Sequence, residues 1–96
     1  MTEKQITELA LIFKTLGHPA RLKIALGLAE KTECNVSKMV EKLGLPQPAV
    51  SQHLAALKNA GIIEGVRKGG TTCYRLAENA EALRVLKASG AKCGGK

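Results

Sequence analysis

Cysteine is the residue type in this chain with the widest choice of chemistry, and it occurs at Cys34, Cys73 and Cys93. If the three thiolates converge, they suit trivalent arsenic or another soft metal ion. Two of them could instead form a regulatory disulfide or a persulfide link. In the third interpretation the thiols are incidental, with Cys34 packed, Cys73 exposed and Cys93 in a loose tail. The residues themselves leave all three interpretations open.

The length and net charge of the chain limit the number of domains and the class of partner. The 96 residues suffice for one domain with one core, and because only 2% of them are aromatic, that core must be aliphatic. The net charge of +7 favours a polyanionic partner such as nucleic acid, with a solvated basic surface as the simpler alternative. No signal-peptide pattern or membrane-length apolar run is present, so we expect a cytoplasmic protein with reduced thiols.

Apolar residues recur at helical spacing in four consecutive segments that glycine and proline delimit. The helices are expected over 5–16, from Pro19 onward, after Asn35 as N-cap and over 47–60. The expected buried stripe of the second helix is Leu22, Ala25, Leu26 and Ala29. The third helix ends at Gly44, so only a short turn separates it from the fourth.

Two β-prone runs follow, over 62–66 and 71–76, around a Gly-Gly turn that is typical of a hairpin. In the second run Tyr74 and Cys73 alternate, so a buried Tyr74 would leave Cys73 partly exposed beside Arg75, which favours its thiolate. A last helix is expected over 79–88. The predicted fold is mainly α with a small β-hairpin, a winged helix-turn-helix of order α-α-α-α-β-β-α. One domain over 1–90 precedes a flexible tail, 91–96.

The fourth helix carries the surface that points to function. Opposite its buried residues it presents short polar side chains and alanines without a carboxylate, as a helix in the major groove requires. Gln can bind adenine through two hydrogen bonds, and Ser can contact a base edge or a phosphate. The expected DNA contacts are Gln47, Pro48, Ser51, Gln52, His53, Ala55 and Lys58, with Arg67 and Lys68 at the hairpin tip. The simpler alternatives are a solvated helix face and a solvated turn.

The two histidines do not indicate an enzyme. Neither has an acidic cluster nearby, and no nucleophile–base pair or metal-hydrolase spacing is present. His18 precedes Pro19 and is expected to cap and pack a helix. His53 is expected to contact DNA or to pack, rather than to bind a metal.

Three stretches together resemble the ArsR/SmtB-type repressors: "LGHPARLKIALGL", "LGLPQPAVSQHLAALKNAGII" and "RKGGTTCYRL". The resemblance runs in one unbroken order from about Leu9 to Leu86. It implies a homodimeric winged-helix repressor that leaves a near-palindromic operator when a metal, metalloid or oxidant alters a sensing site. It further implies that the first and last helices form the dimer interface, here through Leu9, Phe13, Leu83 and Leu86.

The family's usual metal sites do not match this chain. The soft-metal Cys-x-Cys positions of the resemblance hold Asn35 and Ser37, and the expected final helix has no histidine for a zinc site. Any sensing by Cys34 would therefore need Cys93 or Cys73, from its own chain or the other subunit. No resident cofactor is expected, and arsenite or a soft metal ion is the candidate ligand.

The expected function is that of a repressor released by a thiol-directed signal, namely arsenite, a soft metal, an oxidant or reactive sulfur. The first alternative is a constitutive DNA-binding regulator without a ligand. The second is a protein-interaction or metal-buffering module that does not bind DNA, which would lack a steep salt dependence of DNA affinity.

Overall fold

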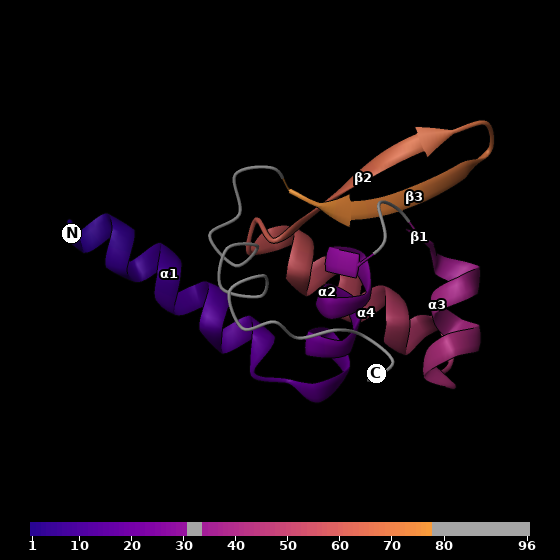
Figure 1. Cartoon of the computed structure of the whole chain (residues 1–96), viewed down its shortest axis with the longest axis horizontal. Coiled ribbons are helices and arrows are strands. Elements are labelled where there is room, and N and C mark those ends of the chain that lie inside the picture. Colours follow the sequence, from indigo (N-terminus) through magenta and orange to yellow (C-terminus); the bar gives the residue numbers. More distant parts are fainter. Residues whose placement is uncertain (31–33, 78–96) are drawn as a thin grey trace.

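The computed structural model describes residues 1–30 and 34–77, and Figure 1 shows their arrangement. In chain order the elements are α1 (Glu3–Leu16), α2 (Pro19–Glu30), β1 (Cys34–Asn35), α3 (Val36–Leu43), α4 (Gln47–Asn59), β2 (Ile63–Lys68) and β3 (Thr71–Leu76). The helix expected over 79–88 lies outside the described residues, as do Leu83, Leu86 and Cys93. Within the described part, no helix combines the length and apolar character needed to cross a membrane.

Local signals fix the ends of α1 and α2. The Thr2 side chain accepts a hydrogen bond from the Gln5 N–H at 3.1 Å, and Gln5 Oε1 accepts one from the Thr2 N–H at 2.8 Å. This capping box starts α1 two residues before the expected boundary, and Gly17 ends it. Pro19 begins α2 as expected, and His18 Nδ1 accepts a hydrogen bond from the Ala20 N–H at 3.2 Å. The capping role predicted for His18 is therefore present.

The stripe expected on α2 is only partly correct. The fully buried residues are Ile24, Ala25 and Leu28, whereas Leu22 and Leu26 are half-buried and pack at the edge of the core. The reason is that α2 packs against α1, α4 and β3 together, so burial extends around more than one face. A prediction that assumes one buried face therefore misidentifies which residues of α2 are most deeply buried.

The sheet has three strands in the order β1-β3-β2, both pairs antiparallel. Strand β1 was not predicted, because two residues are too few for a pattern and their partners, Tyr74 and Cys73, lie far along the chain. Asn35 ends this strand and also caps α3, its side chain accepting from the Lys38 N–H at 2.9 Å. The start of α3 is thus tied directly to the sheet.

The hairpin is longer than predicted, since Arg67 and Lys68 are the last residues of β2 and only Gly69 and Gly70 form the turn. Gly69 has φ 63°, while Gly70 has no positive φ, which fits a type II′ turn. In Figure 1 the hairpin extends beyond the helices, and α1 projects in another direction.

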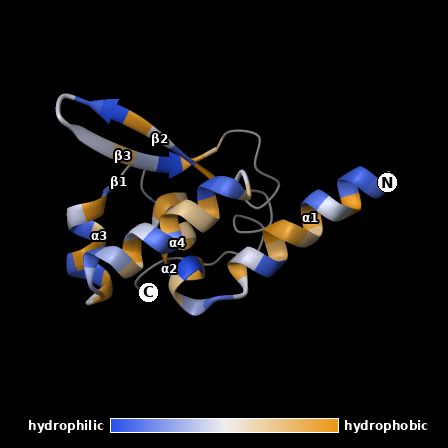
Figure 2. Cartoon of the chain, turned by 180° about the vertical axis from the view of Figure 1, so that it is seen from behind, coloured by the Kyte–Doolittle hydropathy of each residue, from blue (hydrophilic) through white to orange (hydrophobic). Residues whose placement is uncertain are grey.

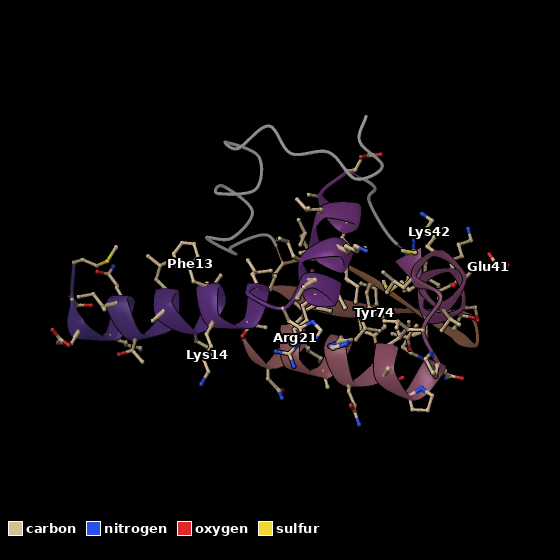
Figure 3. All side chains as sticks on the ribbon, turned by 90° about the horizontal axis from the view of Figure 1, so that it is seen from below. Phe13, Lys14, Arg21, Glu41, Lys42 and Tyr74 are labelled. Carbon is tan, nitrogen blue, oxygen red and sulfur yellow. The ribbon has the colours of Figure 1, made fainter. Side chains whose placement is uncertain are left out.

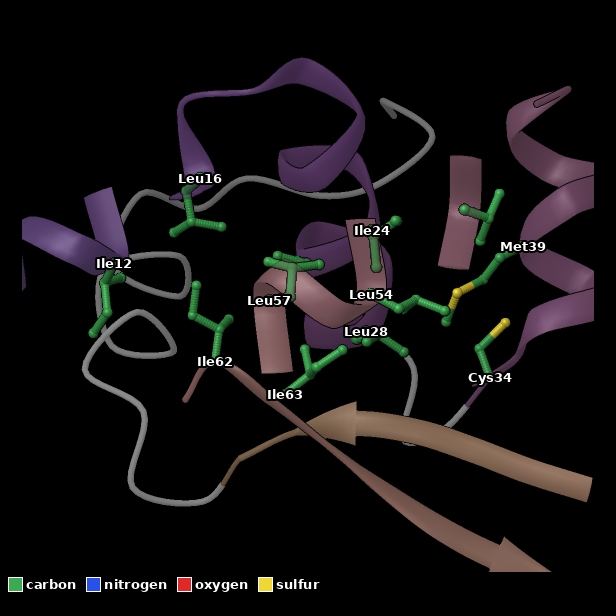
Figure 4. Close-up of a cluster of buried hydrophobic side chains, with 12 residues drawn as sticks. Ile12, Leu16, Ile24, Leu28, Cys34, Met39, Leu54, Leu57, Ile62 and Ile63 are labelled. Atoms are coloured by element: carbon green, nitrogen blue, oxygen red, sulfur yellow. The ribbon is translucent and has the colours of Figure 1, made fainter. Parts of the chain in front are cut away.

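Aliphatic side chains from the helices and β2 form the core, shown in Figure 4. Helix α4 contributes Val50, Leu54 and Leu57, as its spacing predicts, and these are at most 2% exposed. Figure 2 shows hydrophobic and hydrophilic residues interspersed along each helix. The burial of this stripe determines which residues of α4 face solvent.

Candidate DNA-binding surface

Helices α3 and α4 form a helix-turn-helix with a tight connection. Gly44 has φ 67°, a left-handed conformation that favours glycine, and its N–H donates to the Val40 carbonyl at 2.9 Å. Leu45 and Pro46 complete the turn, and α4 begins at Gln47. Because the turn is short and α3 is capped by Asn35, the two helices are held at a defined angle.

The outward face of α4 has the character expected of a recognition helix. The exposed residues on it are Gln47, Pro48, Ser51, Gln52, Ala55, Lys58 and Asn59. All are neutral or basic, and the small Ala55 and Ser51 let the backbone approach a partner closely. Pro46, the N-cap, makes no side-chain hydrogen bond, so no side chain competes with a phosphate at this helix end.

The hairpin adds positive charge beside this helix. Arg67 and Lys68 are exposed, and as neighbours in one strand they point to opposite faces of the hairpin. Near its base, Arg75 Nε and Glu64 Oε2 form an ion pair at 2.7 Å between directly opposed strand positions. This pair stabilises the strand register that sets where the hairpin tip lies.

His53 lies apart from the other predicted contacts. It is half-buried, its Nδ1 accepts a hydrogen bond from Arg21 Nε at 3.2 Å, and its ring lies 4.5 Å from that of His18. Burial, followed by the nearby His18 and Arg21, lowers the pKa of His53 below its ordinary value of 6.5. His53 therefore joins α2 to α4, the packing role that its sequence position left open beside DNA contact.

Arg21 is a functional candidate that the sequence pattern did not reveal. It lies in the motif "HPAR", but nothing in the local pattern indicates that it bonds to a residue 32 positions away. In Figure 3 its side chain extends from α2 toward α4. Tertiary packing alone brings the two residues together.

The strand register separates two of the three cysteines. Cys34 is opposite Tyr74, and Cys73 is opposite Asn35, so the neighbouring positions Cys34 and Cys73 lie on opposite faces of the sheet. Cys34 is 9% exposed and belongs to the core, with its thiol 3.6 Å from the Asn35 carbonyl, whereas Cys73 is half-buried. Within one chain these two thiols therefore cannot pair or bind the same ion in this fold.

Arg75, expected to favour the Cys73 thiolate, forms an ion pair with Glu64, and its effect on the thiol stays a prediction. Its guanidinium pairs with Glu64 across the strands, so its charge is compensated there. Among residues 1–30 and 34–77, no three His, Cys, Asp or Glu side chains gather as metal ligands would.

Helix α1 presents apolar side chains that the described fold does not cover. Phe13 is 50% exposed, Ile6 and Leu11 are each 46% exposed, and Leu9 is half-buried. Figure 3 shows Phe13 and Lys14 pointing to opposite sides of α1. Apolar exposure of this extent on a projecting helix is typical of an association surface.

Comparison with known proteins identifies the family. The sequence profile described as "Bacterial regulatory protein, arsR family" matches residues 18–65, which span α2 to β2. A "Biofilm growth-associated repressor" of Agrobacterium fabrum is 44% identical over 86 residues, covering 90% of this chain and 72% of the relative. The chain belongs to the ArsR family. As a member it is a DNA-binding transcriptional repressor and not an enzyme, as the resemblance implied.

Solved structures of similar proteins share the fold. "Reduced HlyU" from Vibrio cholerae superposes with a TM-score of 0.80 at 28% identity, covering 90% of this chain and 88% of that one. The "homodimeric winged helix-turn-helix DNA-binding domain" of Mb0332 from Mycobacterium bovis gives a TM-score of 0.80 at 26% identity, covering 94% and 84%. The winged helix-turn-helix prediction is confirmed, with β1 as an added third strand.

Proposed function

We propose that this ArsR-family protein acts in the cytoplasm as a homodimer, places α4 of each subunit in a major groove, and leaves its operator when Cys34 is modified. The DNA-binding part of this proposal rests on the exposed face of α4, which has no carboxylate. This face points outward because Val50, Leu54 and Leu57 on the opposite face are buried. The net charge of +7 supports a polyanionic target.

The contacts follow from residue chemistry. Gln52 binds adenine through its amide, Ser51 donates to a base edge or phosphate, and Ala55 allows close approach. Gln47, the α4 N-terminus and Lys58 bind phosphates on either side. Arg67 and Lys68 contact the flanking backbone or minor groove from the hairpin. Pro48 shapes the helix start, and His53 supports it from the side facing α2.

Dimerisation supplies the second recognition helix. Among the apolar side chains that α1 exposes, we assign Phe13 and the half-buried Leu9 to the interface, and Leu83 and Leu86 are their proposed partners. The similar Mb0332 domain of Mycobacterium bovis is homodimeric, which supports this arrangement. A two-fold dimer requires a near-palindromic site with half-sites one helical turn apart.

The location of Cys34 supports a thiol signal. Its buried sulfur lies in β1, directly before the cap of α3, so added oxygen or sulfur atoms would find little space. Relief of that crowding would displace β1 from β3 and move α3 against α4. Since Cys73 faces the other side of the sheet, the partner sulfur is Cys93 or a thiol of the second subunit.

Two kinds of signal fit this site. An oxidant or reactive sulfur would link Cys34 to Cys93, and this possibility is supported by the similar HlyU protein of Vibrio cholerae, whose solved structure is specified as "Reduced". Arsenite or a soft metal ion would need thiolates from Cys34 and Cys93 and from Cys73 of the second subunit. We favour the thiol link because it needs only two sulfur atoms.

A DNA-release assay tests this function directly. Operator DNA selected from a random pool is titrated by fluorescence anisotropy at several salt concentrations, then challenged with arsenite, a soft divalent metal, a thiol oxidant and a persulfide donor. Steep salt dependence with release by oxidant or persulfide, lost in Cys34→Ser and Cys93→Ser but kept in Cys73→Ser, is the expected result. Release that persists in all three variants contradicts the thiol mechanism, and an absence of release indicates a constitutive regulator.

A further inference from the structure

The side chains of His18, Arg21 and His53 meet where α2 packs against α4. Arg21 Nε donates to His53 Nδ1 at 3.2 Å. The His18 and His53 rings lie 4.5 Å apart at 53°. His18 Nδ1 in turn accepts from the Ala20 N–H at 3.2 Å, which anchors it to the first turn of α2.

This arrangement defines the protonation of the His53 imidazole. Arg nitrogens only donate, so an imidazole nitrogen that accepts from them carries no hydrogen. His53 is therefore neutral in this contact, with its hydrogen on Nε2. A protonated His53 would have no acceptor for Arg21 and would place a second cation against its guanidinium.

The Arg21–His53 contact lies next to the residues proposed to contact bases. His53 follows Gln52 and Ser51 directly in α4. Apolar packing of the α4 stripe sets which face of the helix points outward, but the hydrophobic effect is non-directional, so it defines the exact rotation of α4 less sharply than a hydrogen bond does. A hydrogen bond between fixed atoms of α2 and α4 constrains that rotation.

We propose that Arg21 is a positioning residue for operator binding: through His53 it fixes the rotation of α4, and with it the direction in which Ser51 and Gln52 face the DNA. This inference rests on the proposed DNA contacts of α4. It makes the specificity of binding dependent on a neutral His53.

The surroundings of His53 give this joint a pH dependence. Two charged groups influence the pKa of His53: His18, in the connection before α2, and Arg21, on α2. Helices α1 and α3 and strand β2 also pack against α4, but within the described residues they add no further charged group that shifts this pKa. Both groups are basic, so neither stabilises an imidazolium. The Arg21–His53 hydrogen bond should therefore break when His53 becomes protonated, as the pH falls below the ordinary histidine pKa of 6.5.

The test compares operator DNA with unrelated DNA, because the ratio of the two affinities cancels general charge effects. Arg21→Met removes the donor, and Lys23→Met removes one charge from an exposed position of the same helix as the matched control. We expect Arg21→Met to lower the ratio about threefold to tenfold, the worth of one hydrogen bond, while Lys23→Met weakens both affinities alike. Equal ratios in the two variants overturn the proposal.

Measuring the affinity ratio at several pH values distinguishes a positioning role of the Arg21–His53 contact from a purely structural one. His53→Asn keeps an acceptor near the Nδ1 position but does not titrate. The wild-type ratio should fall as the pH drops below 6.5, because the pKa of His53 in the folded protein is lower than this ordinary value, and the ratio of His53→Asn should stay flat over that range. A wild-type profile that is flat, or that His53→Asn reproduces, contradicts the inference.

Imidazole ¹⁵N spectra of the free wild-type protein test the joint without DNA or variants. They should show neutral His53 as a single tautomer with hydrogen on Nε2, and a tautomer mixture overturns the proposal even if Arg21→Met does not fold. Lack of sequence-specific binding by the wild type at any pH would instead reject the proposed function, while these spectra still decide the Arg21–His53 contact.

Discussion

At the residue scale, α4 separates side chains that hold the fold from side chains that face a partner. Val50, Leu54 and Leu57 are buried, whereas Gln52 and Ser51 are exposed and make no contact on which folding depends. Because specificity and stability reside in different residues of one helix, each can be changed without the other.

Gln52→Ala should weaken operator binding by about 1–3 kcal/mol and leave the free energy of unfolding unchanged, since it removes only a base contact from an exposed position. Anisotropy titrations with operator and unrelated DNA measure the first quantity, and urea denaturation the second. Lys58→Ala is the control: it should weaken both DNAs alike and reduce the salt slope by about one. Unchanged operator affinity in Gln52→Ala would contradict the groove assignment.

The lowered pKa of His53 predicts how stability varies with pH. In the unfolded chain His53 binds a proton near its ordinary pKa of 6.5, but in the folded protein only at a lower pH. Between the two values the unfolded state binds more protons, so the free energy of unfolding decreases as the pH falls through this range and is fully restored above it. Urea denaturation across this range should show the decrease in wild type and a smaller one in His53→Asn. The same slope in both proteins would show that other groups cause it.

At the element scale, Asn35 joins the sheet to the helix-turn-helix. Its backbone pairs with Cys73 in β3, and its side chain caps α3. The base of the hairpin is set by Glu64 and Arg75 on one face and by the packing of Tyr74 against Gly65 on the other. In the proposed mechanism, these contacts would transmit a movement of β1 to the elements proposed to face the DNA.

Asn35→Ala should lower the free energy of unfolding by about 1 kcal/mol, because the Lys38 N–H loses its acceptor. Asn35→Asp keeps a side-chain acceptor at the helix N-terminus and should be close to wild type. Urea denaturation compares the three proteins. Equal destabilisation by both substitutions would mean that the cap contributes little.

Gly65→Ala should destabilise the hairpin by about 1–3 kcal/mol, the usual cost of overpacking. The added Cβ would lie 3.2 Å from Thr72 Cγ2 and 3.4 Å from Tyr74 Cε1, so the Thr72 methyl group must shift while the Tyr74 ring stays in ordinary contact. Gly70→Ala is the matched control, since its Cβ would meet nothing within 4 Å. Thermal unfolding of the two variants should differ accordingly; equal midpoints would indicate that Thr72 moves without cost.

At the scale of the whole molecule, the proposed association of two subunits would set the DNA affinity. One subunit presents one α4, and α1 projects with Phe13 half exposed. Two linked recognition helices bind a near-palindromic operator far more tightly than one, because the second contact is intramolecular.

Phe13→Gln should therefore raise the dimer dissociation constant by about tenfold or more, as burial of a Phe side chain contributes about 1.5–3 kcal/mol. Lys14→Gln, on the other side of α1 in Figure 3, is the control and should remain dimeric. Sedimentation velocity measures the mass of each, and operator affinity should fall only in Phe13→Gln. A stable Phe13→Gln dimer would place the interface elsewhere.

The helices, the tight turn at Gly44, the hairpin and the outward face of α4 could all be predicted from the amino-acid sequence. These features depend on residues close together in the chain: caps such as Asn35, stops such as Gly44, and the apolar period through Val50 and Leu54. Such signals are local, so the approximate boundaries and the exposed face could be predicted without tertiary contacts.

The strand β1, the pattern of burial on α2, the Arg21–His53 contact and the separation of Cys34 from Cys73 required the folded structure. Each depends on segments distant in the chain that packing brings together, such as Cys34 beside Tyr74. Side-chain direction in a sheet follows from the register with the partner strand, and no local pattern records that register. For that reason the sequence left the pairing of the thiols open, whereas the fold excludes Cys73 as the partner of Cys34 within one chain.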